Sequence, residues 1–433
     1  MTNQPVGRVR WFMVFWLFVL GAVSYLDRVN ISIAGSAMAD QYHLSQIRLG
    51  SIFSAFLLGY AAFQTPGGWL ADKLGPRYVL TLGVAWWGAF TALTASLPAS
   101  LAGAFFYLIA IRFLLGTGEA IIYPASNRFV SQWIPSQERG LANGLIFAGV
   151  GAGAGSAPLL VTYLMVHYGW RWPFWASTII GLLAGLVWYL AARDNPEQHT
   201  WVSGEELAYI QAFRRPRSAA STIDSSDSLG EDSVSQSWTQ IVFSRNLLAI
   251  TISYFAFGYV AWIFFSWFYI YLAKVRGLDL KASAAYSTLP PLAIVICSIS
   301  GGALSDALTK SYGKRTGRCI LACVALLLAA LILVLGSRVA SAPLAGIVLS
   351  GGVGALYLAQ SSYWAVTADI AGSKAGFASG FMNMGGQLGG ALTSFLTPVI
   401  AQSYGWTSSF LAAAILSTLG GLAWLLVEPD RTV

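Results

Sequence analysis

The chain has 433 residues, of which 56% are apolar and only 10% carry a charge, and its formal net charge is +7. Soluble domains average about 25% charged residues, so a water-facing surface of the ordinary kind is not available to this chain. The composition excludes a soluble enzyme, a disordered chain and a fibrous one, and it predicts a protein that crosses a membrane many times.

Twelve long apolar runs follow one another along the chain, six before and six after one long polar stretch. Because a bilayer crossing takes about 20 mostly apolar residues, each run is long enough for one helix. We therefore predict an all-α membrane protein with twelve transmembrane helices. The runs cover residues 11–36, 47–71, 78–98, 101–125, 140–165, 172–192, 246–273, 283–305, 319–336, 343–367, 376–402 and 407–427.

The polar stretch divides the chain into three predicted parts. Residues 1–192 form an N-terminal six-helix bundle, residues 193–245 a cytoplasmic linker loop, and residues 246–433 a C-terminal six-helix bundle. We expect one short amphipathic helix in the linker, around Gly204–Phe213. The serine- and acid-rich run Ser218–Ser237 follows it and is typical of a flexible linker.

The basic residues between the runs predict the orientation in the membrane. Seventeen Lys and Arg residues fall on the side of the amino terminus and six on the opposite side. Since positive loops stay in the cytoplasm, we expect both termini to be cytoplasmic and the protein to lie in the inner cell membrane. Arg28 and Arg112 belong to neither side. No cleavage motif follows Trp11–Leu26, which predicts a retained first helix.

Two short stretches recur at nearly the same spacing. Gly68–Asp72 (GWLAD) returns as Gly302–Asp306 (GALSD) after 234 positions, and Tyr168–Trp170 (YGW) returns as Tyr404–Trp406 after 236 positions. This agreement predicts that a six-helix unit is duplicated and that the two bundles are pseudo-symmetric. Six-helix repeats around a site near the bilayer midplane are an architecture of secondary transporters.

The segment GGWLADKLGPR at residues 67–77 joins the second and third runs. Glycine permits close helix approach, and Asp72 can accept hydrogen bonds from the N-terminus of a neighbouring helix. We predict a conformational latch formed by Gly68, Asp72, Arg77 and, in the second half, Asp306; an ordinary solvated turn is the alternative. The segment resembles the loop signature of the major facilitator superfamily, which implies the major facilitator fold.

Four charged residues fall well inside predicted spans, away from their ends: Asp27 and Arg28 in the first, Arg112 and Glu119 in the fourth. A charge in a bilayer costs at least a few kcal/mol, so such residues face a polar interior and usually carry function. Arg112 and Glu119 are nearly two turns apart, which predicts one shared helix face, about 10 Å apart along the axis. Two static ion pairs between the first and fourth helices are the alternative. The matching positions of the second half carry no charge, which favours a functional role for these four residues over a purely structural one.

Longer motifs around these charges resemble a known family. YLDRVN at residues 25–30 is similar to the first-helix signature of the anion:cation symporters. RFLLGTGEA at 112–120 and WIPSQERG at 133–140 resemble their fourth helix and the loop after it. The resemblance covers the whole chain and is most specific over residues 24–144. Relatives by pattern include bacterial galactonate, glucarate and hexuronate transporters, and animal sialin and vesicular glutamate transporters.

The resemblance implies carboxylate transport that is usually coupled to protons, with Asp27 and Glu119 as protonation sites. Phe53 stands where vesicular glutamate carriers have a histidine, which disfavours a glutamate carrier. The glycines near 149–151 stand where galactonate-type members place a glutamine. The substrate-binding positions that we predict come from both halves and are Arg28, Arg112, Tyr60, Gln360, Ser361, Trp364 and Asn383.

Together these features predict a proton-coupled symporter that imports a small organic anion by alternating access. The expected cargo is a sugar acid: an aldonate, a hexuronate or an aldarate. We expect protons and the lipid bilayer as further partners, a monomer, and no enzyme activity, cofactor, metal or nucleic acid. Two alternatives stay open: a non-transporting membrane sensor on a carrier fold, and a proton-coupled drug or organic-ion antiporter. The intramembrane arginines favour anionic cargo.

Overall fold

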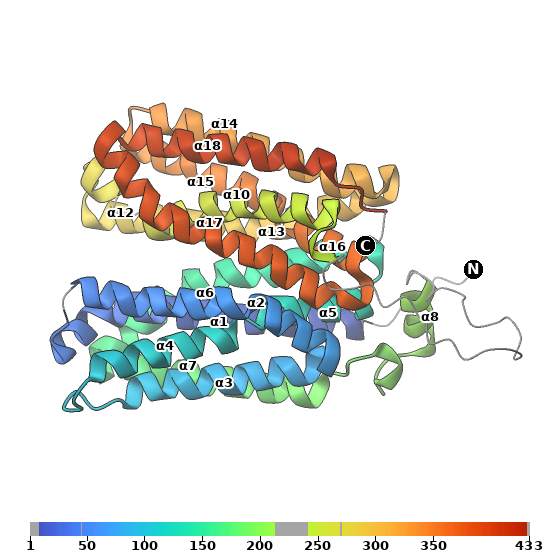
Figure 1. Cartoon of the computed structure of the whole chain (residues 1–433), viewed down its shortest axis with the longest axis horizontal. Coiled ribbons are helices and arrows are strands. Elements are labelled where there is room, and N and C mark those ends of the chain that lie inside the picture. Colours follow the sequence, from blue (N-terminus) through green and yellow to red (C-terminus); the bar gives the residue numbers. More distant parts are fainter. Residues whose placement is uncertain (1–7, 45, 213–240, 269–270, 431–433) are drawn as a thin grey trace, which may run out of the picture.

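The computed structural model describes residues 8–44, 46–212, 241–268 and 271–430, and all regular secondary structure in these ranges is helical. Long helices run side by side along the molecule (Figure 1). Those of the first half are α1 (Val9–Tyr42), α2 (Gln46–Leu74), α3 (Pro76–Ser96), α4 (Ala104–Glu119), α5 (Ile122–Trp133), α6 (Arg139–Tyr168) and α7 (Trp172–Ala191). Those of the second half are α10 (Arg245–Ser266), α12 (Leu280–Ser287), α13 (Leu289–Lys314), α14 (Leu321–Arg338), α15 (Ala342–Leu358), α16 (Gln360–Ala371), α17 (Ala375–Tyr404) and α18 (Trp406–Ala423).

Nine stretches of the described chain are long and apolar enough to cross a membrane. Two of them, Ala285–Arg338 and Ala342–Thr393, have 54 and 52 residues. Each of these holds two crossings, because one crossing takes about 20 residues. Helix α2 has 29 residues and packs lengthwise against α4 and α17, so it supplies the remaining crossing. The predicted all-α fold with twelve transmembrane helices is confirmed.

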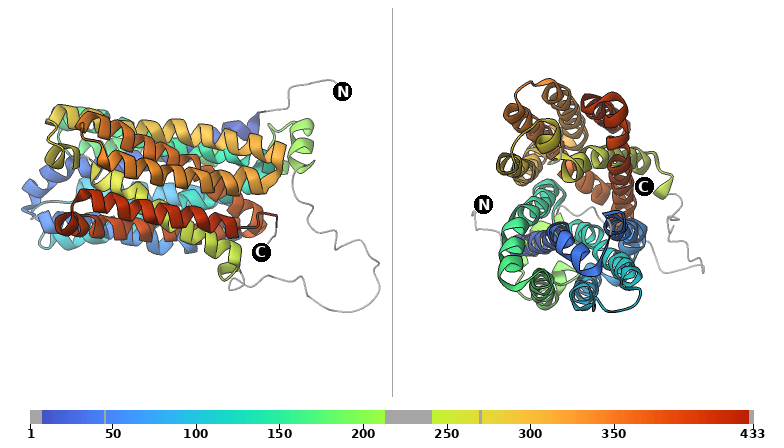
Figure 2. Two further views of the ribbon diagram at one scale, coloured as in Figure 1. Left: turned by 90° about the horizontal axis from the view of Figure 1, so that it is seen from above. Right: turned by 90° about the vertical axis from the view of Figure 1, so that its left-hand side faces the viewer.

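The helices form two groups that meet along two seams. Within the first half α1 packs against α6 and α3 against α7; within the second, α10 packs against α17 and α14 against α18. The seams between the halves are α6 against α13 and α2 against α17. The view along the helices shows the two groups as separate clusters (Figure 2). A duplicated six-helix unit accounts for this arrangement.

The repeated Tyr-Gly-Trp sequences end two helices in the same way. Gly169 follows α6 with φ 91°, and Gly405 follows α17 with φ 83°. Side chains disfavour this left-handed region, so glycine is the residue that allows the chain to turn there. The next helices, α7 and α18, begin within three residues. The sequence repeat therefore marks the same reversal in both halves.

Several predicted runs differ from the structure. The run predicted over 101–125 is broken, because α4 ends at Glu119 and α5 begins at Ile122; the run over 343–367 breaks at Ala359. Pro124 contributes to the first break, since it has no N–H to donate to the preceding turn. Glu119 consequently lies at a helix end rather than well inside a helix. The seventh run also ends early, at Ser266, before a π-helical turn at Tyr271–Val275.

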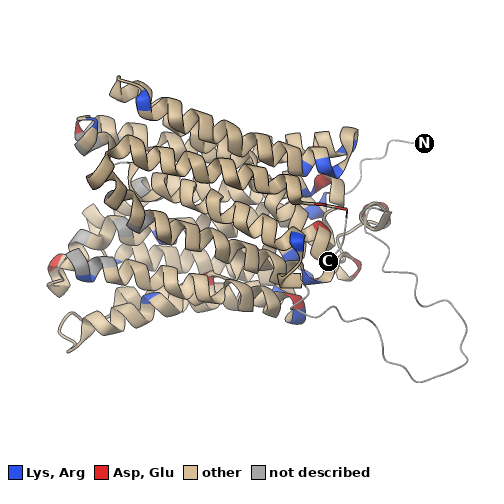
Figure 3. Cartoon of the chain, turned by 45° about the horizontal axis from the view of Figure 1, so that its top comes forward, with Lys and Arg blue, Asp and Glu red and all other residues tan. Residues whose placement is uncertain are grey.

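The linker begins with ordered structure. A 3-10 turn covers Pro196–Gln198, and helix α8 (Gly204–Ala212) lies where the short linker helix is predicted. Residues Ser218–Ser237 lie outside the described residues. Lysines and arginines gather at the end of the molecule that carries α8, which we call the α8 end (Figure 3).

Candidate functional site

An ion pair inside the first half joins α1 to the end of α4. Arg28 Nε donates to Glu119 Oε1 at 2.5 Å, and the two side chains are 9% and 1% exposed. Arg28 Nη2 and Glu119 Oε2 have no hydrogen-bond partner among the described residues. Arg112 and Glu119 both lie in α4, which ends at Glu119, and the partner of Glu119 lies on α1. One donor and one acceptor of this buried pair are left for another group.

Asp27 and Arg112 lie near this pair, but no direct ion pair joins them in the described structure. Asp27 Oδ2 accepts a hydrogen bond of 2.6 Å from the Thr91 hydroxyl of α3, and Asp27 Oδ1 has no described partner. Arg112 is 2% exposed and lies on the Phe56 ring at 5.1 Å. Its Nε and Nη1 donors have no described acceptor. The alternative interpretation requires two static ion pairs between the first and fourth helices. The described structure contains one of them, Arg28–Glu119.

A cavity lies between the halves beside this cluster. The cavity is narrow: the volume in which a water molecule can be centred is about 40 Å³. Aromatic rings dominate the wall and three amides interrupt it, a composition typical of small-molecule sites. The first half lines it with Tyr25, Tyr60, Tyr123, Phe147 and Val150; the second half lines it with Tyr254, Phe257, Gly258, Ala261, Trp262, Phe265, Tyr357, Gln360, Asn383, Gly386 and Gln387.

The predicted substrate-binding residues divide into two groups. Tyr60, Gln360 and Asn383 line the cavity, whereas Ser361, Trp364, Arg28 and Arg112 do not. Arg28 is nevertheless close, because its guanidinium carbon lies 4.6 Å from the ring centre of Tyr25 and 4.2 Å from that of Tyr60. Both rings line the cavity, so Arg28 contacts residues of the cavity wall.

Much of the cavity wall was not predicted. Tyr25 appears in the first-helix motif but was not assigned to binding, and Tyr123, Tyr254, Trp262 and Phe265 were not singled out. Tyr25 and Phe265 face one another across the halves with ring centres 6.4 Å apart. The only signal in the sequence is the high aromatic content, 14%. That number does not say which rings face the cavity.

At the α8 end two aspartates cap helices of the opposite half. Asp72 Oδ1 and Oδ2 accept hydrogen bonds from the backbone N–H groups of Gly376 and Phe377, at 3.0 and 2.8 Å, where α17 begins. Asp306 does the same for Gly140 and Leu141, at 2.9 and 2.6 Å, where α6 begins. An anionic side chain at a helix N-terminus is favourable. Both caps tie the halves together.

The other predicted latch residues lie differently. Gly68 lies directly against the Gly376 backbone, so a Cβ there would meet the Gly376 carbonyl oxygen. Arg77 stays within its own half: its side chain donates to the Tyr189 carbonyl at 3.0 Å, and its backbone N–H donates to Asp194 Oδ1 at 2.8 Å. Arg77 thus fixes α3 to the end of α7, and its part in a latch between the halves stays a prediction.

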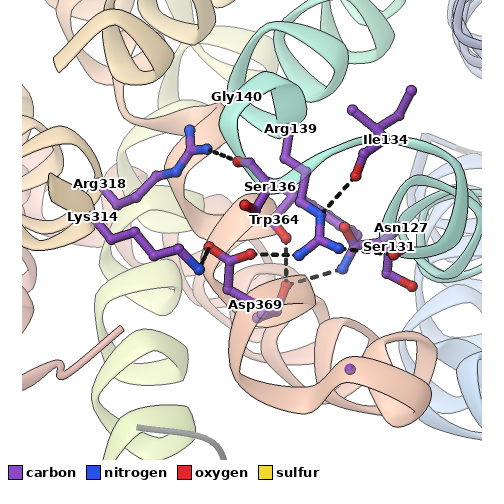
Figure 4. Close-up of polar contacts among 12 residues, drawn as sticks. Asn127, Ser131, Ile134, Ser136, Arg139, Gly140, Lys314, Arg318, Trp364 and Asp369 are labelled. Carbon is purple, nitrogen blue, oxygen red and sulfur yellow. Dashed lines mark hydrogen bonds and ion pairs between the residues drawn. The ribbon is translucent and has the colours of Figure 1, made fainter. Parts of the chain in front are cut away.

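A further set of contacts closes the α8 end and was not predicted. Arg139 of α6 pairs with Asp369 of α16, and Lys314 Nζ lies 3.0 Å from the other Asp369 oxygen (Figure 4). Arg318 donates to the Ser136 carbonyl at 2.8 Å. Arg139 stands in the loop motif of the resemblance, but its partner lies 230 positions away. Helix packing alone decides that pairing.

Helix α8 docks onto the same end. Glu206 is fully buried and accepts hydrogen bonds from the Arg10 backbone at 3.1 Å and from Arg10 Nη1 at 3.2 Å. Arg10 also pairs with Glu138 at 2.9 Å, and the Tyr209 hydroxyl donates to Glu138 at 2.9 Å. Burial raises the pKa of Tyr209, which keeps its hydroxyl a donor. The linker helix thereby holds Glu138 in the turn before α6, and Arg139, the first residue of α6, reaches the second half.

Comparison with known proteins explains this combination of two helical halves, a central cavity and capping aspartates. A family model described as Major Facilitator Superfamily matches residues 17–394 and 365–433. The chain belongs to this superfamily. It is therefore a membrane transporter and not an enzyme. Among the described residues no group of three or more His, Cys, Asp or Glu side chains is placed to hold a metal ion.

Two relatives cover almost the whole chain. "Probable sulfoacetate transporter SauU" of Cupriavidus necator is 33% identical over 95% of this chain and 92% of its own. "Probable galactarate/D-glucarate transporter GudP" of Bacillus subtilis is 30% identical over 99% and 95%. The expected membership in the anion:cation symporter group is confirmed. A solved proton:xylose symporter of the superfamily, XylE, has the same fold, with a TM-score of 0.73 at 15% identity over 95% of this chain and 94% of that one.

Proposed function

We propose that this transporter is a proton-coupled symporter that imports a small organic anion of the sugar-acid class. The observation that carries the proposal is the position of Arg28. Its guanidinium is paired with Glu119 and at the same time faces Tyr25 and Tyr60, two rings of the cavity wall. A planar guanidinium binds carboxylates through parallel hydrogen bonds. In this place it can exchange the Glu119 carboxylate for that of a substrate.

The same pair supplies a route for coupling to protons. Glu119 and Asp27 are buried, and each has one oxygen without a described partner. A carboxylate that is kept from water can hold a proton near neutral pH. When Glu119 takes a proton, its attraction for Arg28 falls, and Arg28 becomes available to the incoming anion. Asp27 and Arg112 form the second carboxylate and arginine of the cluster.

We assign the α8 end to the cytoplasm, because lysines and arginines gather there. With this assignment both termini belong to the cytoplasmic side, and we propose the inner cell membrane as the location and a monomer as the transporting unit. The Asp72 and Asp306 caps and the Arg139–Asp369 pair hold this end closed. Rocking of the two halves breaks these contacts and opens the cavity inward.

The cargo is inferred from the relatives and from the cavity. The two relatives are named for sulfoacetate and for galactarate and D-glucarate, all of which are organic anions. The lining amides Gln360, Asn383 and Gln387 can bind hydroxyl groups, which sugar acids carry and sulfoacetate lacks. These amides favour the sugar acids: aldonates, hexuronates and aldarates.

Uptake into liposomes that contain the purified protein tests the proposal. With the outside more acidic than the lumen, a labelled sugar acid from a panel of D-galactonate, D-glucuronate and D-glucarate should accumulate above its outside concentration. A protonophore should abolish the accumulation. Binding without movement would indicate a sensor, and acid-driven expulsion of organic cations would indicate an antiporter. Either result contradicts the proposal.

A further inference from the structure

Two of the three amides in the second-half wall of the cavity have their donor ends already bound by the protein. Gln360 Nε2 donates to the Tyr254 hydroxyl at 3.1 Å. Gln360 is 2% exposed, and its Oε1 has no partner among the described residues although the residue lines the cavity. The N–H end of this amide is therefore bound to Tyr254, and the carbonyl oxygen is the end left to accept a hydrogen bond.

The Asn383 side chain is fixed in a similar way, by a residue of the first half. Its Nδ2 donates to Gln64 Oε1 of α2 at 2.9 Å, and Gln64 is fully buried in the seam between α2 and α17. Asn383 Oδ1 makes no hydrogen bond within the described structure, and the residue lines the cavity. Two separate amides thus offer acceptors to whatever occupies the cavity.

We infer that Tyr254 and Gln64 are positioning residues that turn the carbonyl oxygens of Gln360 and Asn383 toward the cavity, where they accept hydrogen bonds from substrate hydroxyls. The inference rests on the proposed transport of a sugar acid and deepens it. It assigns the hydroxyl-bearing carbons to the second half. It assigns the acid group to the first half, where the Tyr60 and Tyr123 hydroxyls lack described partners and Arg28 lies behind Tyr60.

The chemistry of the wall explains the selection. A hydroxyl group is a donor as well as an acceptor, so it can donate to Gln360 Oε1. A carboxylate or sulfonate only accepts at neutral pH, so it leaves both carbonyl oxygens unsatisfied and is repelled by them. Gln387 is the third lining amide and has no described hydrogen bond, so it can turn either end and does not select.

A series of six-carbon aldonates, each lacking one hydroxyl, tests the inference by competition against labelled D-galactonate. For the unaltered protein, loss of the hydroxyl that reaches Gln360 or Asn383 should weaken binding about tenfold, because the carbonyl oxygen is left unpaired. In Tyr254→Phe the Gln360 amide can rotate. The loss of affinity caused by removing the hydroxyl that reaches Gln360 should therefore fall from about tenfold to about twofold. In Gln64→Leu the penalty for a different deoxy acid should fall.

Two controls separate positioning from general damage. Tyr259→Phe removes a hydroxyl from the same helix, α10, whose oxygen has no described partner and which does not line the cavity, so both penalties should persist. Gln64→Glu keeps an acceptor for Asn383 and should restore the penalty lost in Gln64→Leu. Equal penalties in the unaltered protein, Tyr254→Phe and Gln64→Leu overturn the inference but leave symport standing. If no sugar acid competes at all, the proposed function fails as well.

Discussion

Arg28 and Glu119 lie 91 positions apart in the sequence and form a buried ion pair at 2.5 Å, with Arg28 also stacked on Tyr60 at 4.2 Å. A buried pair of this kind is costly to break from one side, because the remaining charge is left without a partner. The pair therefore has two stable arrangements under the proposed function: intact, or replaced by a protonated Glu119 and a bound anion. The predictions on Arg28 and Glu119 test these arrangements separately.

Arg28→Lys should weaken substrate binding at least about tenfold although the positive charge is kept. The guanidinium fork and its stacking on Tyr25 and Tyr60 are lost, and hydrogen bonds to charged groups contribute about 1.5–3 kcal/mol. Equilibrium binding of labelled D-galactonate to the purified protein measures the change. Arg112→Lys, whose Nε and Nη1 have no described acceptor, is the companion variant. Unchanged affinity in both variants would show that neither arginine holds the substrate.

Gly68→Ala should slow transport markedly, because its Cβ would meet the carbonyl oxygen of Gly376 and force α2 and α17 apart. Overpacking of a tight contact costs about 1–3 kcal/mol, so we expect a loss of about fivefold to a hundredfold in uptake rate. Gly351→Ala is the matched control, since nothing lies within 4 Å of a Cβ at that helical position. Equal rates for the two variants would mean that the α2–α17 seam need not close.

The sequence predicted the helices better than their contacts. Hydropathy marks a crossing because backbone groups in a bilayer must bond within the helix, and this local rule located the twelve spans. The cap of Gly376 and Phe377 by Asp72 is of the kind that the loop sequence suggested. The partner of Glu119 was not predictable from its spacing to Arg112, because a spacing along α4 does not say how α1 packs against that helix. Nor does any local pattern join Arg139 to Asp369, whose pairing depends on how α6 and α16 pack.

Glu206→Gln should lower the free energy of unfolding by about 1–3 kcal/mol. The fully buried Glu206 carboxylate accepts hydrogen bonds from the backbone N–H and the side chain of Arg10. Glutamine keeps the shape but removes the charge that strengthens both bonds. Thermal unfolding in detergent measures the loss. Glu205→Gln, an exposed neighbour on the same short helix, should leave the melting temperature unchanged. A melting temperature equal for the two variants would show that α8 docking does not stabilise the fold.

Glu119→Gln separates substrate movement from proton coupling. Glutamine has nearly the size of glutamate and imitates its protonated form permanently. Arg28 then lacks its anionic partner and stays available to the substrate, so binding should be retained. Exchange of labelled for unlabelled substrate across the membrane should also continue, because exchange needs no net proton movement. Accumulation driven by a pH gradient should fail, since the step that releases the proton is gone.

The decisive measurement pairs counterflow with gradient-driven uptake in one liposome preparation of Glu119→Gln. Persistent counterflow shows that the protein is folded and inserted, so a loss confined to pH-driven uptake can only come from coupling. Asp27→Asn is the less clean variant, because Asp27 Oδ2 also accepts the Thr91 hydroxyl, and an amide nitrogen in that place would break the contact between α1 and α3. If Glu119→Gln kept full pH-driven accumulation, the Arg28–Glu119 pair would be structural. The coupling proton would then have to be carried by Asp27, the other buried carboxylate beside Arg112.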